Sequence, residues 1–424
     1  MKRIFTLLAL ALLISCSKEK TSITNINDYN KYLKTSDVEN TSKFFELWNG
    51  KIKSDSLQTL ALGNVAKEYG RFFKTSGDIE YLKNAERALK KALDEAAIGK
   101  SGYLRALARN YIAQHRFKEA LVLAQKAREM GSGVNASQSL LFDLHMELGN
   151  YTTASKYLDS IQNLSDFGYL IRVAKWNDHK GDLETAIRFM EKAKEKADSS
   201  KNLGLRLWAY TNLADFYGHD GRIEDAYGHY LMALQLDSNN AYAKKGIAWI
   251  VFSYERNPQE ALRIIEAVER TNQSPDLDLF KAEVAEYIGN EEIKAKALED
   301  FHTKVQNSSY GIMYNTHKIE YYLGKGEVTH KALEIANAEI TNRSTPETYD
   351  LLAYSYLQDG KNAKAMELME THVKGKTFEP MAQYHMAQIY KANGYLDDVE
   401  ALKEELMEAS FELGPNMEKA IQEL

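Results

Sequence analysis

Apolar residues recur along most of this chain three and four residues apart, with polar residues between them. This spacing is typical of amphipathic helices and not of strands, where apolar and polar residues alternate. The segment 207–240 shows the pattern best, with one apolar face on a first helix and another on a second: Tyr210, Leu213, Ala214 and Tyr217, then Ala226, Tyr230 and Ala233. The small residues in both faces predict two helices that pack closely against each other.

Prolines and glycines divide this pattern at regular intervals. The prolines at 275, 346, 380 and 415 are separated by 71, 34 and 35 residues, which indicates a unit of 34–36 residues. Glycines in short turns have a similar period, and glycine suits the left-handed conformation between two helices. These glycines are Gly149, Gly181, Gly221, Gly289, Gly326, Gly360 and Gly394. The chain is therefore predicted to consist of repeated helical hairpins.

The unit resembles the tetratricopeptide repeat (TPR), a helix–turn–helix of 34 residues. One copy is carried by Leu213, Ala214, Tyr217, Gly221, Ala226, Tyr230 and Ala233, and another by Tyr349, Leu352, Ala353, Tyr356, Gly360, Ala365 and Met369. Weaker copies fit near 57–95, 135–163, 241–270, 276–305 and 314–341. The resemblance implies an all-α, TPR-like α-solenoid, a right-handed superhelix of about ten helical hairpins with one concave groove. A coiled coil is disfavoured because heptads would not break at each Gly and Pro.

The first 16 residues predict the cellular localisation of the protein. Two basic residues precede an apolar run, Ile4 to Ile14, that is too short to span a bilayer. Leu13-Ile14-Ser15-Cys16 resembles the lipobox of bacterial lipoproteins, which implies cleavage before Cys16 and acylation of that cysteine. An ordinary signal peptide with an incidental cysteine is the alternative. By resemblance, Ser17 in place of an aspartate favours the outer membrane over the inner one, with the periplasmic or surface-exposed face left open.

The domain organisation follows from these two patterns. We expect a signal peptide at 1–15, a lipidated N-terminus and flexible tether at 16–27, and an N-terminal helical cap at 28–54. The repeat array spans 55–415, and a polar C-terminal capping helix occupies 416–424. The single cysteine excludes a disulfide framework within the chain and any Cys-cluster metal site. A formal net charge of −6 argues against nucleic acid as a partner.

The sequence carries no linear motif of an enzyme. It has no His-Glu-x-x-His pair, no phosphate-binding loop with Lys-Ser/Thr and no Gly-x-Ser-x-Gly turn. His219 and His229 lie ten residues apart, which is not a metal-ligand spacing. We therefore expect a non-catalytic protein without a cofactor or metal.

The TPR resemblance implies that the first helix of each hairpin lines the concave groove. Carried onto this chain, it places basic residues in the early groove and mainly polar and aromatic residues later. The basic residues are Arg105, Arg109, Arg172 and Lys175. The later ones are Trp208, Asn212, Asp215, Lys245, Trp249, Tyr354 and Tyr384. Basic residues facing one channel would attract an acidic peptide or a C-terminal carboxylate. A solvated helix face that binds nothing is the alternative for the basic set.

These features favour a lipid-anchored cell-envelope scaffold that binds a protein or peptide in its groove. The carboxylate clamp of TPR chaperone cofactors is disfavoured, since only Arg105 and Arg172 match its five positions. The alternative function is glycan or nutrient capture of the SusD-like type, whose members also combine a lipobox with TPR helices. That family usually carries long insertions, which this repeat array lacks.

Overall fold

The computed structural model describes residues 22–34, 41–53, 58–326 and 329–424. The predicted signal peptide and Cys16 lie outside the described residues. Within the described ranges all regular structure is helical, and ten antiparallel hairpins follow one another from Thr59 to Glu408. This confirms the predicted TPR-like solenoid. None of the helices in these ranges combines the length and apolarity needed to cross a membrane.

The first five hairpins pair α3 (Thr59–Ser76) with α4 (Ile79–Glu95), α5 (Lys100–Ala113) with α6 (Phe117–Glu129), α7 (Val134–Glu147) with α8 (Tyr151–Ser160), α9 (Phe167–His179) with α10 (Leu183–Ser200), and α11 (Leu203–His219) with α12 (Ile223–Leu236). The last five pair α13 (Ala241–Trp249) with α14 (Pro258–Glu269), α15 (Asp276–Tyr287) with α16 (Glu291–Val305), α17 (Asn315–Gly324) with α18 (Thr329–Asn342), α19 (Pro346–Gln358) with α20 (Asn362–Leu368), and α21 (Pro380–Asn393) with α22 (Leu396–Glu408). Two π-helical segments, η2 (Ile250–Tyr254) and η4 (Met369–Val373), extend α13 and α20.

The repeat residues form the core as predicted. Leu213, Ala214 and Ala233 have no exposed surface, and Tyr217 and Ala226 are also buried. The stretches where the repeat was weak in sequence, near 57–95, 276–305 and 314–341, nevertheless form complete hairpins. Each shares an apolar face with its neighbours, so that packing outweighs the degraded local pattern.

Two turns explain irregularities in the glycine spacing. No glycine marks the turn of the second hairpin or of the sixth. His115 and Arg256 stand at these two turns and each adopts a left-handed backbone with φ of 58°. The turn geometry is therefore conserved along the array, although its usual residue is not present at every turn.

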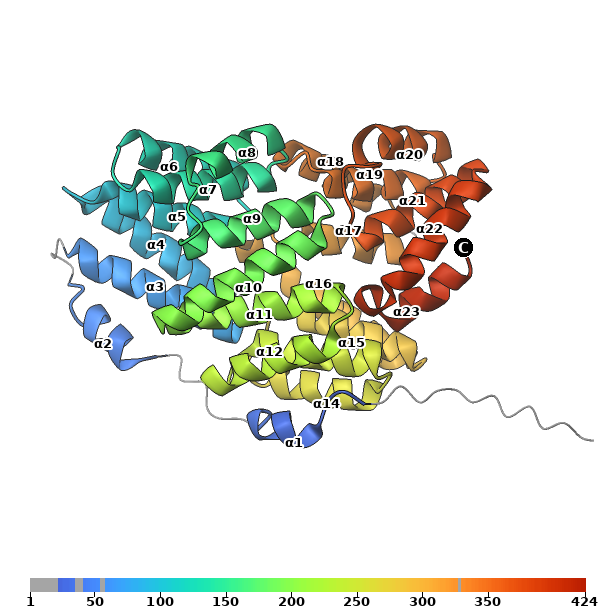
Figure 1. The fold of residues 1–424 in the computed structure, drawn as a ribbon, viewed down its shortest axis with the longest axis horizontal. Coiled ribbons are helices and arrows are strands. Elements are labelled where there is room, and N and C mark those ends of the chain that lie inside the picture. The colour runs from blue at the N-terminus through green and yellow to red at the C-terminus, as the bar shows by residue number, and fades with distance from the viewer. Residues whose placement is uncertain (1–21, 35–40, 54–57, 327–328) are drawn as a thin grey trace, which may run out of the picture.

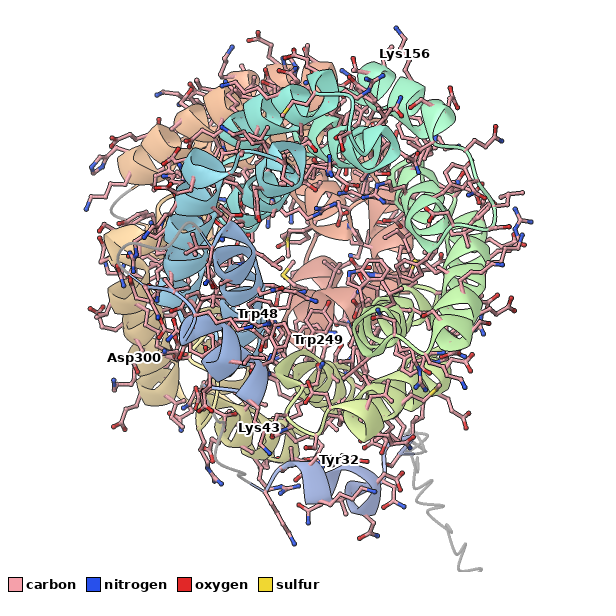
Figure 2. All side chains as sticks on the ribbon, turned by 90° about the vertical axis from the view of Figure 1, so that its left-hand side faces the viewer. Tyr32, Lys43, Trp48, Lys156, Trp249 and Asp300 are labelled. Atoms are coloured by element: carbon pink, nitrogen blue, oxygen red, sulfur yellow. The ribbon has the colours of Figure 1, made fainter. Side chains whose placement is uncertain are left out.

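The hairpins wind into a right-handed superhelix that makes more than one full turn (Figures 1 and 2). Seen along its axis, the chain runs clockwise away from the viewer, and the later hairpins lie behind the earlier ones (Figure 2). The second turn packs on the first at an offset of about 195 residues. Asn272 donates a hydrogen bond to the Thr75 carbonyl, 197 residues away, and His219 lies 2.6 Å from Glu412, 193 residues away.

Glycines permit the close approach of the two turns. A Cβ on Gly77 would lie 2.6 Å from the backbone nitrogen of Ser274, and one on Gly149 would lie 2.5 Å from the carbonyl oxygen of Ser344. A Cβ on Gly181 or Gly218, also in the first turn of the superhelix, would lie 2.9 Å from the ring of Phe378 or 3.0 Å from the ring of Phe411. Glycines at hairpin turns, such as Gly77 and Gly149, thus let the two superhelical turns pack closely, in addition to reversing the chain within a hairpin.

The N-terminal segment docks far from the start of the array. Glu255 accepts hydrogen bonds from the backbone nitrogens of Ile23 and Thr24 at 2.8 and 2.6 Å, and from the hydroxyls of Ser22 and Thr24. Tyr29, in the short helix α1 (Ile26–Tyr29), is buried and donates to Glu260. Residues 22–27 were predicted as part of a flexible tether, but Glu255 holds residues 22–24 against the sixth hairpin, and the backbone nitrogen of Asn25 donates to Tyr227 of the fifth.

The predicted cap at 28–54 divides between two places. Its first part, which includes Tyr29, packs on the fifth and sixth hairpins, whereas α2 (Lys43–Asn49) packs on α3. There the ring of Phe45 contacts the rings of Tyr69 and Phe72 edge-on, with the ring centroids 5.3 Å apart in both pairs. Only α2 therefore lies where an N-terminal cap was expected.

The C-terminal helix is longer than predicted and makes contacts with hairpins in the middle of the chain. It is α23 (Ser410–Gln422), which bends at Gly414 and begins six residues before the expected 416. The carbonyl of Phe411 accepts hydrogen bonds from Trp249 and Ser253, and Glu418 pairs with Arg256. This helix thus joins the end of the chain to the middle hairpins and lies near the superhelix axis at the far end in Figure 2.

Candidate binding groove on the inner wall

The first helices of the hairpins form the concave side of the superhelix, here called the inner wall. In Figure 2, Trp249 lies on this side, while Lys156 and Asp300 lie on the outer edge. Equivalent positions of consecutive first helices, from the second hairpin to the tenth, carry a column of polar or aromatic residues 32 to 40 residues apart: Arg109, Asp143, Lys175, Asp215, Trp249, Glu283, Glu320, Tyr354 and Gln388. The column is therefore where a ligand would meet one residue from each of these hairpins.

Three of the four predicted basic residues already have partners. Arg172 pairs with Asp143 at 2.5 Å and also donates to the carbonyls of Ser139 and Gly168. Lys175 pairs with Glu147 at 2.7 Å. The guanidinium of Arg105 donates to the carbonyl of Ser132 and the hydroxyl of Ser137, and it therefore ties its hairpin to the next loop. These side chains contribute more to the packing of the array than to a free basic surface.

Arg109 differs from these three. Its side chain is exposed within the inner wall and forms no hydrogen bond or ion pair with the described residues. Burial by the surrounding hairpins, together with repulsion from Arg172, lowers its pKa, and Asp143 only partly offsets this. Arg109 is thus the basic inner-wall residue with donors available for an acidic group.

A cavity of about 470 Å³ opens on the inner wall between the fifth and eighth hairpins. Asp215 lies at one side and accepts hydrogen bonds from the hydroxyls of Tyr230 and Tyr242, at 2.5 and 2.7 Å. Tyr230 belongs to the second helix α12 and reaches Asp215 past Gly246, where a Cβ would lie 2.3 Å from its ring. Only glycine at 246 therefore allows this core tyrosine to fix a groove carboxylate.

Aromatic rings and one ion-paired lysine form another part of the cavity lining. The ring of Trp249 packs edge-on against Phe280, with centroids 5.4 Å apart, and its indole nitrogen donates to the Phe411 carbonyl at 3.1 Å. Lys245 forms an ion pair with Asp276. The cavity thus has an apolar face and no unpaired lysine or arginine among its lining residues.

Two further carboxylates, Glu283 and Glu320, line the cavity and form no hydrogen bond or ion pair with the described residues. Burial among the hairpins raises the pKa of Glu283 to about 8, with repulsion from Glu286 as a smaller cause. Burial also raises the pKa of Glu320 and, despite the two tyrosine hydroxyls, that of Asp215. The Nδ1 atom of His317, on the same lining, is buried without a hydrogen-bond partner.

The remaining predicted groove residues are less available than expected. Trp208 is 36% exposed and lies edge-on to Phe167, and Asn212 donates to the Trp208 carbonyl. Tyr354 stacks on His385 with centroids 3.8 Å apart. Tyr384 was expected to line the groove, but it is only 8% exposed because residues of α22 and α23 cover it.

The sequence-based prediction missed Tyr242, Glu283, His317 and Glu320, because the repeats near 241–270, 276–305 and 314–341 matched the TPR pattern weakly. A signal was nevertheless present. Counting 34 residues from Trp249 leads to Glu283, and counting 34 back from Tyr354 leads to Glu320. In the part of the chain that the structure describes, no group of three or more His, Cys, Asp or Glu is placed to hold a metal ion.

No protein-family model matches the chain, and no curated protein matches it in sequence. Among solved structures, it is similar to a human IFIT1 dimer with m7Gppp-AAAA, at 13% identity and a TM-score of 0.45, over 74% of this chain and 70% of that one. A Rap protein complexed with Competence and Sporulation Factor is 14% identical, with a TM-score of 0.46 over 62% and 80%. A tetratricopeptide repeat protein from Parabacteroides merdae is 16% identical, with a TM-score of 0.39 over 55% and 92%. These likenesses concern the fold alone.

Proposed function

We propose that this protein is a lipid-anchored scaffold of the bacterial cell envelope that binds a segment of a protein partner along its inner wall. The observation that carries this proposal is Arg109, an exposed guanidinium on the inner wall without a hydrogen-bond or ion-pair partner among the described residues. The other predicted basic residues of the later hairpins, Arg172 and Lys175, already have acidic partners. An acidic side chain or a C-terminal carboxylate of the partner would accept two parallel hydrogen bonds from the guanidinium of Arg109.

The anchoring part of the proposal rests on the sequence Leu13-Ile14-Ser15-Cys16. Acyl chains on Cys16 would hold the chain in the membrane, with the outer membrane favoured by Ser17. The docked segment at 22–24 supports a defined attachment, because it places the chain that follows the anchor against Glu255 of the sixth hairpin. We expect binding to be non-catalytic and to need no cofactor.

The anchor is tested by replacing its cysteine. Cys16→Ser should leave the protein unprocessed by the lipoprotein peptidase and should move it from the membrane to the soluble fraction, as followed by fractionation and by labelling with a fatty-acid analogue. Membrane retention of the variant together with unchanged labelling would contradict the lipid anchor.

The groove is tested at Arg109, and not at Arg105, whose guanidinium holds a loop. Arg109→Glu should reduce capture of the native partner from solubilised envelopes at least ten-fold, while helicity and thermal stability stay unchanged. Lys156→Glu, which makes the same charge change on the outer edge, is the matched control. Equal capture by Arg109→Glu and the wild-type protein would contradict binding at this residue.

A further inference from the structure

Three carboxyl groups line the inner-wall cavity without an ion-pair partner among the described residues. Asp215, Glu283 and Glu320 line it, and its one lysine, Lys245, is engaged by Asp276. The hydrogen bonds to Asp215 come from neutral tyrosine hydroxyls, which orient the carboxylate without cancelling its charge. Three carboxyl groups thus face one cavity whose lysine is engaged by Asp276, and within the described residues the one histidine of its lining, His317, forms no ion pair with them.

Some crowded carboxylates elsewhere in the molecule are paired with cations. Glu86 accepts from Lys90 and Arg116, at 2.6 and 3.0 Å, and Glu260 pairs with Arg263 at 2.7 Å. Others, such as Asp178 and Glu379, resemble Glu283, because burial raises the pKa of each. What distinguishes Asp215, Glu283 and Glu320 is that they line one cavity together with aromatic rings.

The other lining groups also suit a cation. Trp249 and Phe280 provide rings whose faces attract ammonium and guanidinium groups, and Trp is the best of the aromatic residues for this contact. The apolar part of the cavity would accept the aliphatic stem of a lysine or arginine. The buried Nδ1 of His317 offers a further polar contact that the protein itself leaves unmade.

We infer that the cavity between the fifth and eighth hairpins binds a cationic side chain, arginine or lysine, of the partner segment. The ammonium or guanidinium group would lie among Asp215, Glu283 and Glu320, with its stem against Trp249 and Phe280. This rests on the proposed function, and it adds a second charge requirement. The segment that binds the inner wall carries an acidic group for Arg109 and, separately, a basic residue for the cavity.

The test uses short probes in place of the native partner. Two acetylated and amidated pentapeptides of glycine and serine carry either arginine or citrulline at the centre. Citrulline has nearly the shape of arginine without its charge. Titration calorimetry with the purified full-length protein should show the arginine peptide binding at least ten-fold more tightly. Equal affinities, or no binding of the arginine peptide, would overturn the inference.

Variants locate the site. Glu283→Gln with Glu320→Gln should weaken the arginine peptide at least ten-fold, and because neither carboxyl group forms a hydrogen bond or ion pair with the described residues, the fold should be retained. Glu266→Gln with Asp300→Asn replaces two carboxyl groups away from the cavity and should leave the affinity unchanged. Full affinity of the first double variant would show that the peptide binds elsewhere and would overturn the assignment.

A third pentapeptide, with glutamate at its centre, separates this inference from the proposed function. Binding of the glutamate peptide that is lost in Arg109→Glu, without binding of the arginine peptide, would leave the scaffold proposal standing and remove the cation site. Binding of the arginine peptide through Glu283 and Glu320, with partner capture insensitive to Arg109→Glu, would keep the cation site and contradict the proposed role of Arg109.

Discussion

Carboxylates of the same type behave oppositely in this protein, according to what faces them. At Glu86, burial alone would raise the pKa, but hydrogen bonds from Lys90, Gln114 and Arg116 outweigh it and lower the pKa to about 2. At Glu283 no cation opposes the burial, and the pKa rises to about 8. The first residue stabilises the fold when ionised, and the second does so only when protonated.

Glu283 should therefore make the protein less stable as the pH rises. Between the ordinary pKa of a glutamate and about 8, the folded state binds more protons than the unfolded state, so the free energy of unfolding falls with increasing pH. Glu283→Gln should be more stable than the wild-type protein at pH 9, by roughly 1 kcal/mol, and the difference should shrink towards pH 5. Urea unfolding at the two pH values measures this.

Glu86→Gln provides the opposite sign. Its pKa is lowered in the folded state, so the stabilisation is present above the ordinary pKa and is lost as the pH falls through about 2. This variant should be less stable than the wild-type protein at both pH 5 and pH 9. A Glu283→Gln variant that behaves like Glu86→Gln would mean that Glu283 has a cationic partner in the folded state.

At the scale of the element, the turns between helices do two things. They reverse the chain, which needs a left-handed residue, and some of them also support the next turn of the superhelix. Gly149 and Gly221 have nearly the same φ, 73° and 72°, but only Gly149 has a backbone oxygen of the second turn at the position of its missing Cβ. Comparing substitutions at Gly149 and Gly221 therefore separates backbone strain within a hairpin turn from packing between the two superhelical turns.

Gly149→Ala should be more destabilising than Gly221→Ala. Both changes place alanine in the left-handed region, which costs about 1 kcal/mol. Gly149→Ala also brings a methyl group 2.5 Å from the Ser344 carbonyl oxygen, and relieving this contact should cost about 1–3 kcal/mol more. Chemical unfolding compares the two variants. Equal losses would contradict the packing of the second turn on the first.

Glu255 forms most of the hydrogen bonds that hold the start of the docked N-terminal segment. Its carboxylate accepts hydrogen bonds from two backbone nitrogens and two hydroxyls of residues 22–24. Glu255→Gln should weaken this docking by about 1.5–3 kcal/mol, since hydrogen bonds to a charged acceptor are lost.

Hydrogen exchange of the segment 22–33 gives the measurement, with the exposed Glu266→Gln on α14 as the control. Exchange should become faster in Glu255→Gln and stay unchanged in the control. Unchanged protection in both variants would mean that the apolar contacts of Tyr29 and Leu33 hold the segment without Glu255.

At the scale of the whole molecule, sequence and structure agree where contacts are local. The spacing of Gly and Pro, and residues such as Leu213 and Ala226, are enough to predict hairpins and their approximate number, because each hairpin is defined within one repeat. The right-handed winding was implied by the resemblance to the TPR. The contacts between superhelical turns could not be predicted. They join residues about 195 apart, such as Asn272 and Thr75, and no periodic feature of the sequence marks such pairs.

The candidate site was predicted in part for the same reason. Arg109 and Trp249 lie on the inner wall as the repeat register requires, but the register does not indicate which side chains are engaged by neighbours. The guanidinium of Arg172 forms an ion pair with Asp143 of the preceding hairpin, and Tyr384 is covered by the C-terminal helices. The charge of the groove is therefore set by packing between repeats.

The central claim, that a partner occupies the inner wall, is tested most directly by photo-crosslinking in intact cells. A photoreactive amino acid replaces Gln388 on the inner wall or Lys156 on the outer edge. We predict one discrete adduct with a second protein from position 388, lost when Arg109→Glu is added, and no such adduct from position 156. The same adduct from both positions, or none from position 388, would contradict binding along the inner wall.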